Sequence, residues 1–340
     1  MEDKGKQIRL TAGEVAQLWA QYMNDSSSIC MLTYFLEKAE DSEIIPIIEY
    51  ALQLSKSHIQ KLTAILTEEK NVVPHGFSIK EDVDLTAPRL YSDSYVLNFI
   101  NQMAKVGLTL YAASVATSVR HDITTYYMDC VTETMQLYQK SKDLLLSKGL
   151  FIRSPNLPNL EQVEYVKKQG FILDVFGEKR PLVAAEVDNL FANLQRNAIG
   201  VATLTGFSQV AQNKEVKQFF IKGLEIGNKH IKLFGGKLEE SKLPVPMSWD
   251  SEITNSTTYT FSDRIMMFYT SALIGLSVGF YGTGIALSPR GDIVAMYNRL
   301  SLEVQLYSED GANIMIKNGW LEQPPMASDR DELVRGKNKS

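Results

Sequence analysis

Two histidines at equivalent places in a repeated sequence are the first candidates for chemistry. His58 stands in KSHIQKL and His230 in NKHIKLF, one repeat length further on. Apolar residues at helical spacing flank both, so we expect each imidazole in the middle of a helix. A carboxylate di-iron centre in a helical bundle needs one Glu from each of two helices and Glu-x-x-His from each of the other two. The histidines therefore raise the question of a metal centre in each copy.

The full di-iron ligand set is missing from both copies. Three positions before each histidine stands Ser or Gly rather than Glu. Three positions after Glu133 and Glu303, on another expected helix, stands Gln or Leu rather than His. The sequence therefore argues against ferroxidase and di-iron oxygenase chemistry and predicts a protein that is not an enzyme. No cofactor is expected, and a single transition-metal ion is the alternative.

A smaller polar cluster is expected inside each bundle. Because helices rise by about 1.5 Å per residue, antiparallel packing brings a tyrosine and a glutamate to the level of each histidine. One interpretation is a buried hydrogen-bonded network that fixes the packing. The others are a binding site for a metal or small ligand, or a catalytic site. The predicted clusters are His58, Tyr111 and Glu133, and His230, Tyr281 and Glu303.

A second repeated motif, Ser-x-Arg-x-Asp-Ile, predicts a turn between two helices. It places Arg120 with Asp122 in the first copy and Arg290 with Asp292 in the second. We expect the Asp to be the N-cap of the following helix. The Arg can hold the turn by bridging carbonyls or a carboxylate. A phosphate or carboxylate ligand at this helix N-terminus is the alternative.

A repeated glutamate marks the start of each copy. Thr11-x-x-Glu14 predicts a capping box at a helix N-terminus. The equivalent Glu186 follows Val183, whose side chain cannot accept a hydrogen bond, so this explanation is not expected to hold there.

The repeat itself predicts the fold, all-α with two tandem ferritin-like four-helix bundles. Short turns make the first and second helices, and the third and fourth, antiparallel hairpins. A connection of about 24 residues between the hairpins is long enough to return along the bundle. The expected helices of the first copy span about 12–39, 42–69, 95–118 and 122–147. The expected parts of the chain are a bundle at 1–155, a linker at 156–181, a bundle at 182–328 and a flexible tail at 329–340.

Composition narrows the possible partners and location. The formal net charge of -5 disfavours a general nucleic-acid binder. Two cysteines outside any CxxC pair indicate a reducing compartment rather than a disulfide framework. The N-terminal sequence lacks the features of a secretory signal peptide. The stretch 265–287 carries no charge and is long enough to span a bilayer. We expect it to be a helix buried on most sides between the bundles rather than a transmembrane segment.

The tandem arrangement, the repeated histidine, the Arg-x-Asp turn and the Tyr-x5-Glu runs resemble a protein family of endospore-forming bacteria. The runs are Tyr127 to Glu133 and Tyr297 to Glu303. Members of this family are sometimes labelled spore coat proteins, akin to coat protein F, and the resemblance covers nearly the whole chain. It implies two ferritin-like bundles, a structural or spore-associated role, and a location in the spore coat or the cytoplasm. The implied partners are other coat proteins or further copies of the chain, and no catalytic residues are implied.

Overall fold

The computed structural model describes residues 8–173, 179–246 and 249–334, and over these ranges the chain is all-α. Eight long helices form two four-helix groups, which confirms the predicted fold class and duplication. The first group contains α1 (Ala12–Lys38), α2 (Ile45–Glu68), α4 (Asp93–Thr117) and α5 (His121–Ser147). The second contains α7 (Ala184–Val210), α8 (Lys214–Glu240), α9 (Asp263–Leu287) and α10 (Gly291–Lys317).

Each bundle is built from two helical hairpins and one long crossover, as in ferritin-like proteins. An aspartate at the start of the third helix ties the two hairpins together. Asp93 accepts hydrogen bonds from the backbone N–H groups of Glu40 and Asp41 in the α1–α2 turn, at 3.1 and 2.8 Å. Asp263 accepts the same pair of bonds from the α7–α8 turn. The carboxylate thereby satisfies turn N–H groups while lying in the favourable first turn of its own helix.

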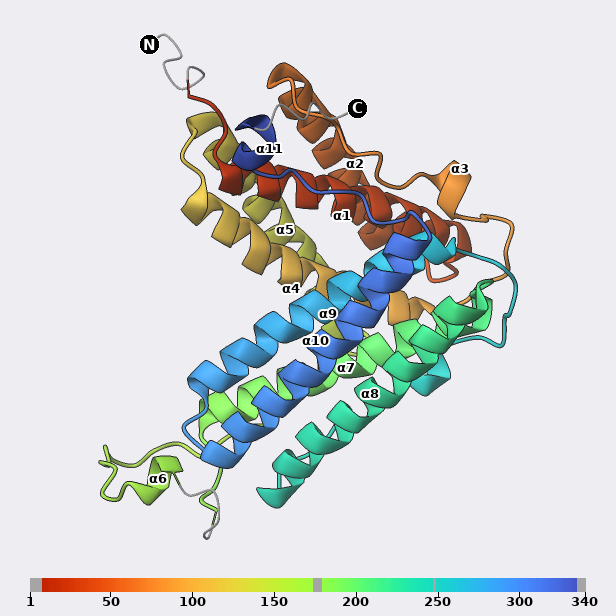
Figure 1. Cartoon of the computed structure of the whole chain (residues 1–340). Coiled ribbons are helices and arrows are strands. Elements are labelled where there is room, and N and C mark those ends of the chain that lie inside the picture. The colour runs from red at the N-terminus through yellow and green to blue at the C-terminus, as the bar shows by residue number, and fades with distance from the viewer. Residues whose placement is uncertain (1–7, 174–178, 247–248, 335–340) are drawn as a thin grey trace.

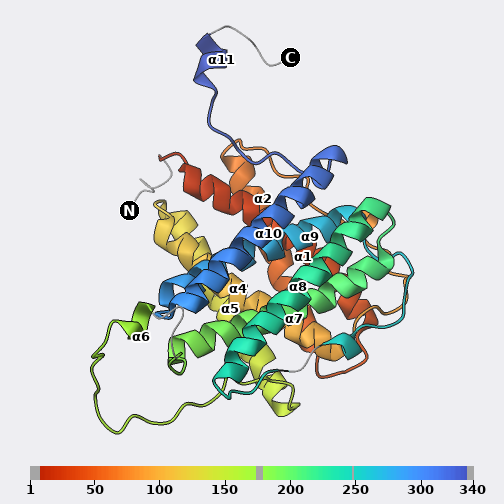
Figure 2. The same cartoon turned by 60° about the horizontal axis from the view of Figure 1, so that its bottom comes forward.

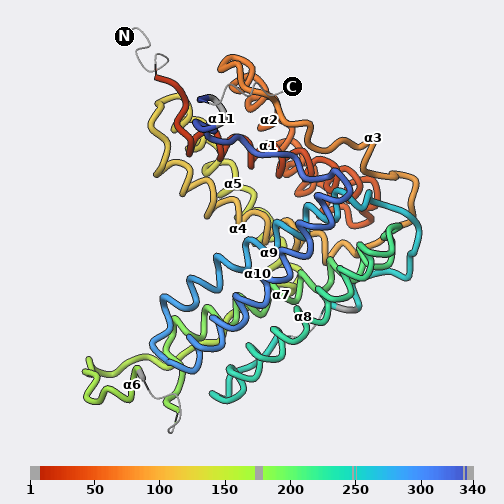
Figure 3. The backbone as a smooth tube through the Cα atoms, viewed as in Figure 1, coloured from red at the N-terminus to blue at the C-terminus, as the bar shows by residue number. Residues whose placement is uncertain are grey.

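The two crossovers pair with each other rather than lying separately on their own bundles. Val83 forms an antiparallel bridge with Phe261, and Tyr91 forms one with Ile253. Ile253 and Phe261 stand in the second copy where Val83 and Tyr91 stand in the first. Each copy therefore offers the other the same contacts that it receives, which is the signature of a two-fold interface. Figure 3 shows the two crossovers meeting at one end of the molecule.

The bundles form the arms of a V whose closed end lies at these crossovers (Figure 1). Aromatic side chains from both copies pack together there. Phe99 of α4 and Tyr269 of α9 have ring centroids 5.6 Å apart, and Tyr34 of α1 and Phe261 have theirs 5.0 Å apart. One continuous hydrophobic core contains residues of both bundles. The two sequence copies therefore pack as a single body.

Helix α9 is less buried than the sequence suggests. Among the described residues it is the one helix long and apolar enough to cross a membrane, and 39% of its most apolar window is buried. Ile265 and Met266, near the closed end of the V, are fully buried. Further along, Gly275 and Gly279 are exposed. The arms diverge in this direction, so that α9 and α4 line the opening of the V (Figure 1).

Short segments outside the bundles complete the described chain. The predicted linker contains a single helical turn, α6 (Gly170–Leu173), and its residues 174–178 lie outside the described ranges. After α10 the chain reaches α11 (Arg330–Val334). Figure 2 shows α6 and α11 standing away from the bundles. Residues 335–340 of the predicted tail also lie outside the described ranges. Two further short elements lie in the crossovers, α3 (Ile79–Asp82) and the 3-10 turn η2 (Asp250–Glu252).

Candidate functional site

The second bundle contains a hydrogen-bonded network centred on His230. The imidazole is fully buried. Its Nδ1 lies 2.9 Å from the Tyr281 hydroxyl and its Nε2 lies 3.0 Å from a carboxylate oxygen of Glu303. Lys229 donates to the other oxygen of Glu303, and Asn197 donates to the Tyr281 hydroxyl. The structure thus brings together the three residues predicted for this bundle, from α8, α9 and α10.

The equivalent network in the first bundle is arranged differently. Nε2 of His58 lies 3.2 Å from Glu133, but Nδ1 lies 3.2 Å from Asp25 of α1. Tyr111 meets the imidazole edge-on, with ring centroids 5.9 Å apart. Asp25 is buried. The sequence analysis did not predict it as part of the network, although an Asp in the middle of an apolar helix indicates a buried polar contact. The second copy has Asn197 at that position.

Because of this difference, one imidazole is positively charged at neutral pH and the other is uncharged. Burial alone would lower the pKa of His58, but hydrogen bonds with Asp25 and Cys130, together with the negative charge of Asp25, raise it to about 11. Burial also lowers the pKa of His230, and there the hydrogen bond to Glu303 does not outweigh it. His58 is therefore an imidazolium held between two carboxylates, whereas His230 is a neutral imidazole.

The donor set does not fit a metal ion. Within the described ranges, no three or more His, Cys, Asp and Glu side chains are grouped so that they could hold one. The reason is visible at His58, where the two carboxylates lie on opposite ring nitrogens and cannot share an ion with that ring. In the second bundle Lys229 already neutralises Glu303.

The two predicted turn motifs form buried guanidinium–carboxylate clamps. Arg120 is buried and bonds Asp122 through two nitrogens, at 3.0 and 2.6 Å, and its third nitrogen bonds Glu69 at the end of α2. Arg290 bonds Asp292 in the same bidentate way, at 2.9 and 2.8 Å. Both guanidinium groups are therefore already paired with carboxylates of the protein. Each helix begins one residue before its Asp, so the prediction of an Asp N-cap is wrong, and the carboxylate bonds the Arg instead.

The repeated glutamates connect the start of each bundle to the same turn. Glu14 accepts from the backbone N–H of Thr11 at 2.7 Å and from that of Arg120 at 2.9 Å. Glu186 accepts from the N–H of its own cap residue and from the α9–α10 turn, both at 2.9 Å. It therefore caps α7 even though the cap residue is a valine, which corrects the expectation from the sequence. The Arg180 guanidinium bonds both oxygens of Glu186 at 2.9 Å.

Beside each histidine lies a cavity, and the two cavities have matching walls. The cavity of the second bundle has a volume of about 130 Å³ and that of the first about 80 Å³. The second cavity has the larger volume because smaller residues line it at three equivalent positions. Where the first cavity is lined by Ser28, Ala51 and Ser55, the second is lined by Gly200, Gly223 and Gly227.

Two like four-helix groups, joined through matching crossovers and each holding a buried histidine network, define a duplicated helical-bundle protein. The chain belongs to the family described as "Protein of unknown function (DUF3231)", whose model matches residues 1–163 and again 170–333. A solved structure from Bacillus halodurans C-125, described as a "putative spore coat protein", is similar at 18% identity and a TM-score of 0.41. The match covers 46% of this chain and 100% of that one. No curated protein matches the sequence.

Proposed function

We propose that this protein is a non-enzymatic structural or interaction protein. The observation that carries this proposal is that protein partners already engage both nitrogens of His58 and of His230. An imidazole in that situation has no free nitrogen with which to accept a substrate proton or bind a metal. It acts instead as a buried connection between neighbouring helices.

The proposed place of action is the spore coat or the cytoplasm of a sporulating cell. The resemblance to coat protein F-like sequences supports this location. The partners would be other coat proteins or further copies of the chain. No role in nucleic-acid binding is proposed, because the net charge is -5.

Deletion of the gene in a spore-forming host, followed by complementation, tests this function. Loss of the protein should change the set of proteins extracted from the spore coat and lower resistance to lysozyme. His58→Gln and His230→Gln variants that remain folded by circular dichroism should restore both properties, because neither imidazole performs chemistry. Unchanged coat composition and resistance after deletion, or folded histidine variants that fail to complement, would count against the proposal.

A second candidate function is the binding of a small ligand. The specific observation in its favour is the pair of equivalent cavities, each ending at a histidine network. Natural cores are close-packed and contain few voids larger than a water molecule. A pocket present at the same place in both copies, and larger in the second, offers room for a small ligand.

A further inference from the structure

The larger cavity lies where the second bundle meets the first. All four helices of the second bundle line it, together with α4 of the first. Its volume of about 130 Å³ is close to that of an engineered cavity of about 150 Å³ that binds benzene. The space therefore suits one aromatic ring or a short aliphatic chain. Its wall is mostly apolar and includes Phe99, Met103, Leu273, Ile274 and Phe280.

A guanidinium group lies on the wall of this cavity without a carboxylate partner. The Arg196 guanidinium carbon lies 3.6 Å from the centroid of the Phe280 ring, which fixes the orientation of the group. Its hydrogen bond to Asn193, at 3.3 Å, goes to a neutral amide. Burial lowers the pKa of Arg196, and Asp188 opposes this effect by its charge without bonding the guanidinium.

A second cation, Lys105, lies in an adjoining pocket rather than on the wall of the large cavity. Lys105 of α4 lines a small adjoining pocket, which shares Gln102 and Ile199 with the large cavity. Its ammonium lies 5.7 Å from the centroid of the Phe151 ring. Burial lowers the pKa of Lys105, and the charge of Arg196 lowers it further. Within the described chain, neither cation has a carboxylate at ion-pair distance, and two half-buried like charges are costly unless an anion compensates them.

The two cations do not repeat in the other copy. The equivalent of Arg196 is Asn24, and the equivalent of Lys105 is Gly275. The first cavity instead contains the acidic Asp25. An arginine side chain that could bind an anion therefore lines the second cavity, whereas no Lys or Arg lines the first.

We propose that the cavity of the second bundle binds a small apolar carboxylate, with its ring or short chain inside and its carboxylate on the guanidinium of Arg196. The proposal rests on the second candidate function and names its ligand class. An apolar wall excludes water from the ring or chain, while a planar guanidinium can bond both oxygens of a carboxylate. Mostly apolar pockets with a few placed polar groups are the usual form of small-molecule sites.

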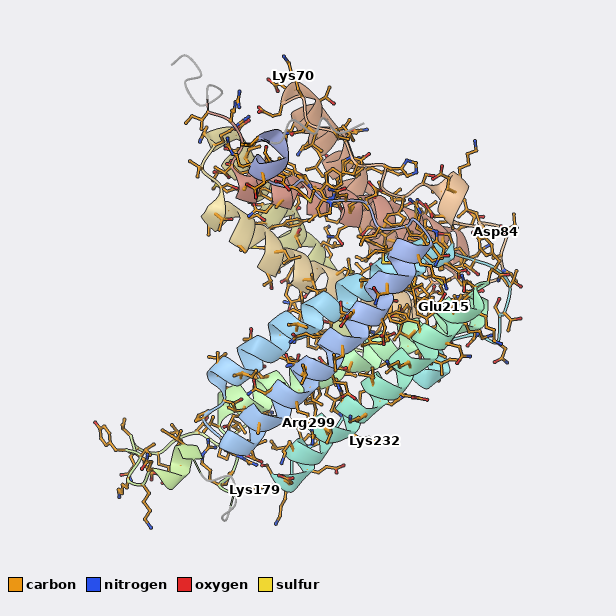
Figure 4. The ribbon with its side chains drawn as sticks, viewed as in Figure 1. Lys70, Asp84, Lys179, Glu215, Lys232 and Arg299 are labelled. Carbon is orange, nitrogen blue, oxygen red and sulfur yellow. The ribbon has the colours of Figure 1, made fainter. Side chains whose placement is uncertain are left out.

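Isothermal titration calorimetry of the full chain with benzoate, phenylacetate and octanoate tests the charge requirement. The neutral amide of each acid serves as its matched control. At least one acid should bind with one equivalent per chain, and its amide should bind at least about tenfold more weakly, because hydrogen bonds to charged groups are the stronger ones. Arg196→Gln should weaken binding of the acid by about tenfold or more. Lys232→Gln should leave binding unchanged, because Lys232 is exposed on the outer face of α8 (Figure 4).

Two glycine substitutions test whether the cavity itself is the site. A Cβ atom added at Gly200 or at Gly236 would have no neighbour within 4 Å, so the first atom of a new side chain meets no obstacle at either position. Gly200 lines the cavity and Gly236 does not. Gly200→Leu should abolish binding of the acid, whereas Gly236→Leu should retain it, with both variants folded by circular dichroism.

The possible outcomes separate the proposal from the function on which it rests. Equal binding of acid and amide, or unchanged binding by Arg196→Gln, overturns the carboxylate assignment but leaves a small-ligand protein. Binding that survives in Gly200→Leu, or two equivalents per chain, overturns the assignment to this cavity. Failure of all six compounds to bind at millimolar concentration overturns the proposal, and for compounds of this size it also removes the support for the small-ligand function.

Discussion

Replacement of Asp25 by Asn should remove a pH dependence of stability that the structure assigns to His58. The folded-state pKa of His58 is about 11, well above its ordinary value of 6.5. A group whose pKa is raised on folding contributes stability that is fully present below the unfolded pKa and is lost as the pH rises through the folded pKa. The window for this group therefore runs from about pH 6.5 to about pH 11.

The size of the effect follows from proton linkage. In that window the folded state holds one more proton than the unfolded state, so the unfolding free energy falls by about 1.4 kcal/mol per pH unit. From about pH 7 to about pH 9 the contribution of His58 falls by about 2.7 kcal/mol. In Asp25→Asn only Cys130 remains to oppose burial, and at His230 one such partner, Glu303, does not outweigh burial. His58 should therefore be neutral over this range, as His230 is.

Urea unfolding of the wild-type and variant proteins from about pH 7 to about pH 9 measures this effect. The difference between their unfolding free energies should shrink by about 1.4 kcal/mol per pH unit. Asp129→Asn, at an exposed position of α5, is the matched control and should show a constant difference from the wild type. Nitrogen NMR of the imidazoles should show His58 protonated throughout this range. A difference between Asp25→Asn and wild type that does not change with pH, or a neutral His58 at pH 8, would refute the reasoning.

Three further substitutions test the contacts that hold the fold. Glu14→Ala leaves buried N–H groups of a helix cap and a turn without acceptors, and should lower the unfolding free energy in urea by about 2–4 kcal/mol. Asp82→Asn weakens an ion pair, 2.8 Å long, between the first crossover and Arg264 at the start of α9. Limited proteolysis should then cut the first crossover faster than in the wild type, at a cost of about 3 kcal/mol in stability. Gly206→Ala would place a Cβ atom in overlap with the Tyr91 hydroxyl, and its melting temperature should fall with a loss of about 1–3 kcal/mol. An unchanged stability in any of the three would show that the contact concerned is not essential to the fold.

Helical periodicity was enough to predict the elements of the fold. The observed helices begin and end within about three residues of the expected ranges, because apolar spacing and turn residues are local signals. The pairing of the crossovers could not be predicted in this way. It joins Val83 to Phe261, and nothing in either segment alone shows that its partner lies in the other copy.

The candidate site could be predicted only where the two copies agree. His58 and Glu133 were found because both recur at the repeat offset. A search for repeated residues cannot find Asp25 or Arg196, which occur in one copy each. Those two residues nevertheless determine the charge of the first network and of the second cavity.

The duplication explains why some residues are the same in both copies and others differ. In a symmetric homodimer every substitution appears twice, so a residue that improves one site also alters the other. Joining two copies in one chain removes that restriction. The residues that stayed alike are those that hold helices and turns together, such as Glu14 with Glu186 and the two Arg–Asp clamps. The residues that diverged surround the cavities, where one copy acquired an imidazolium held by carboxylates and the other acquired more space and unpaired cations. The same frame therefore encloses two interiors that differ in charge and in volume.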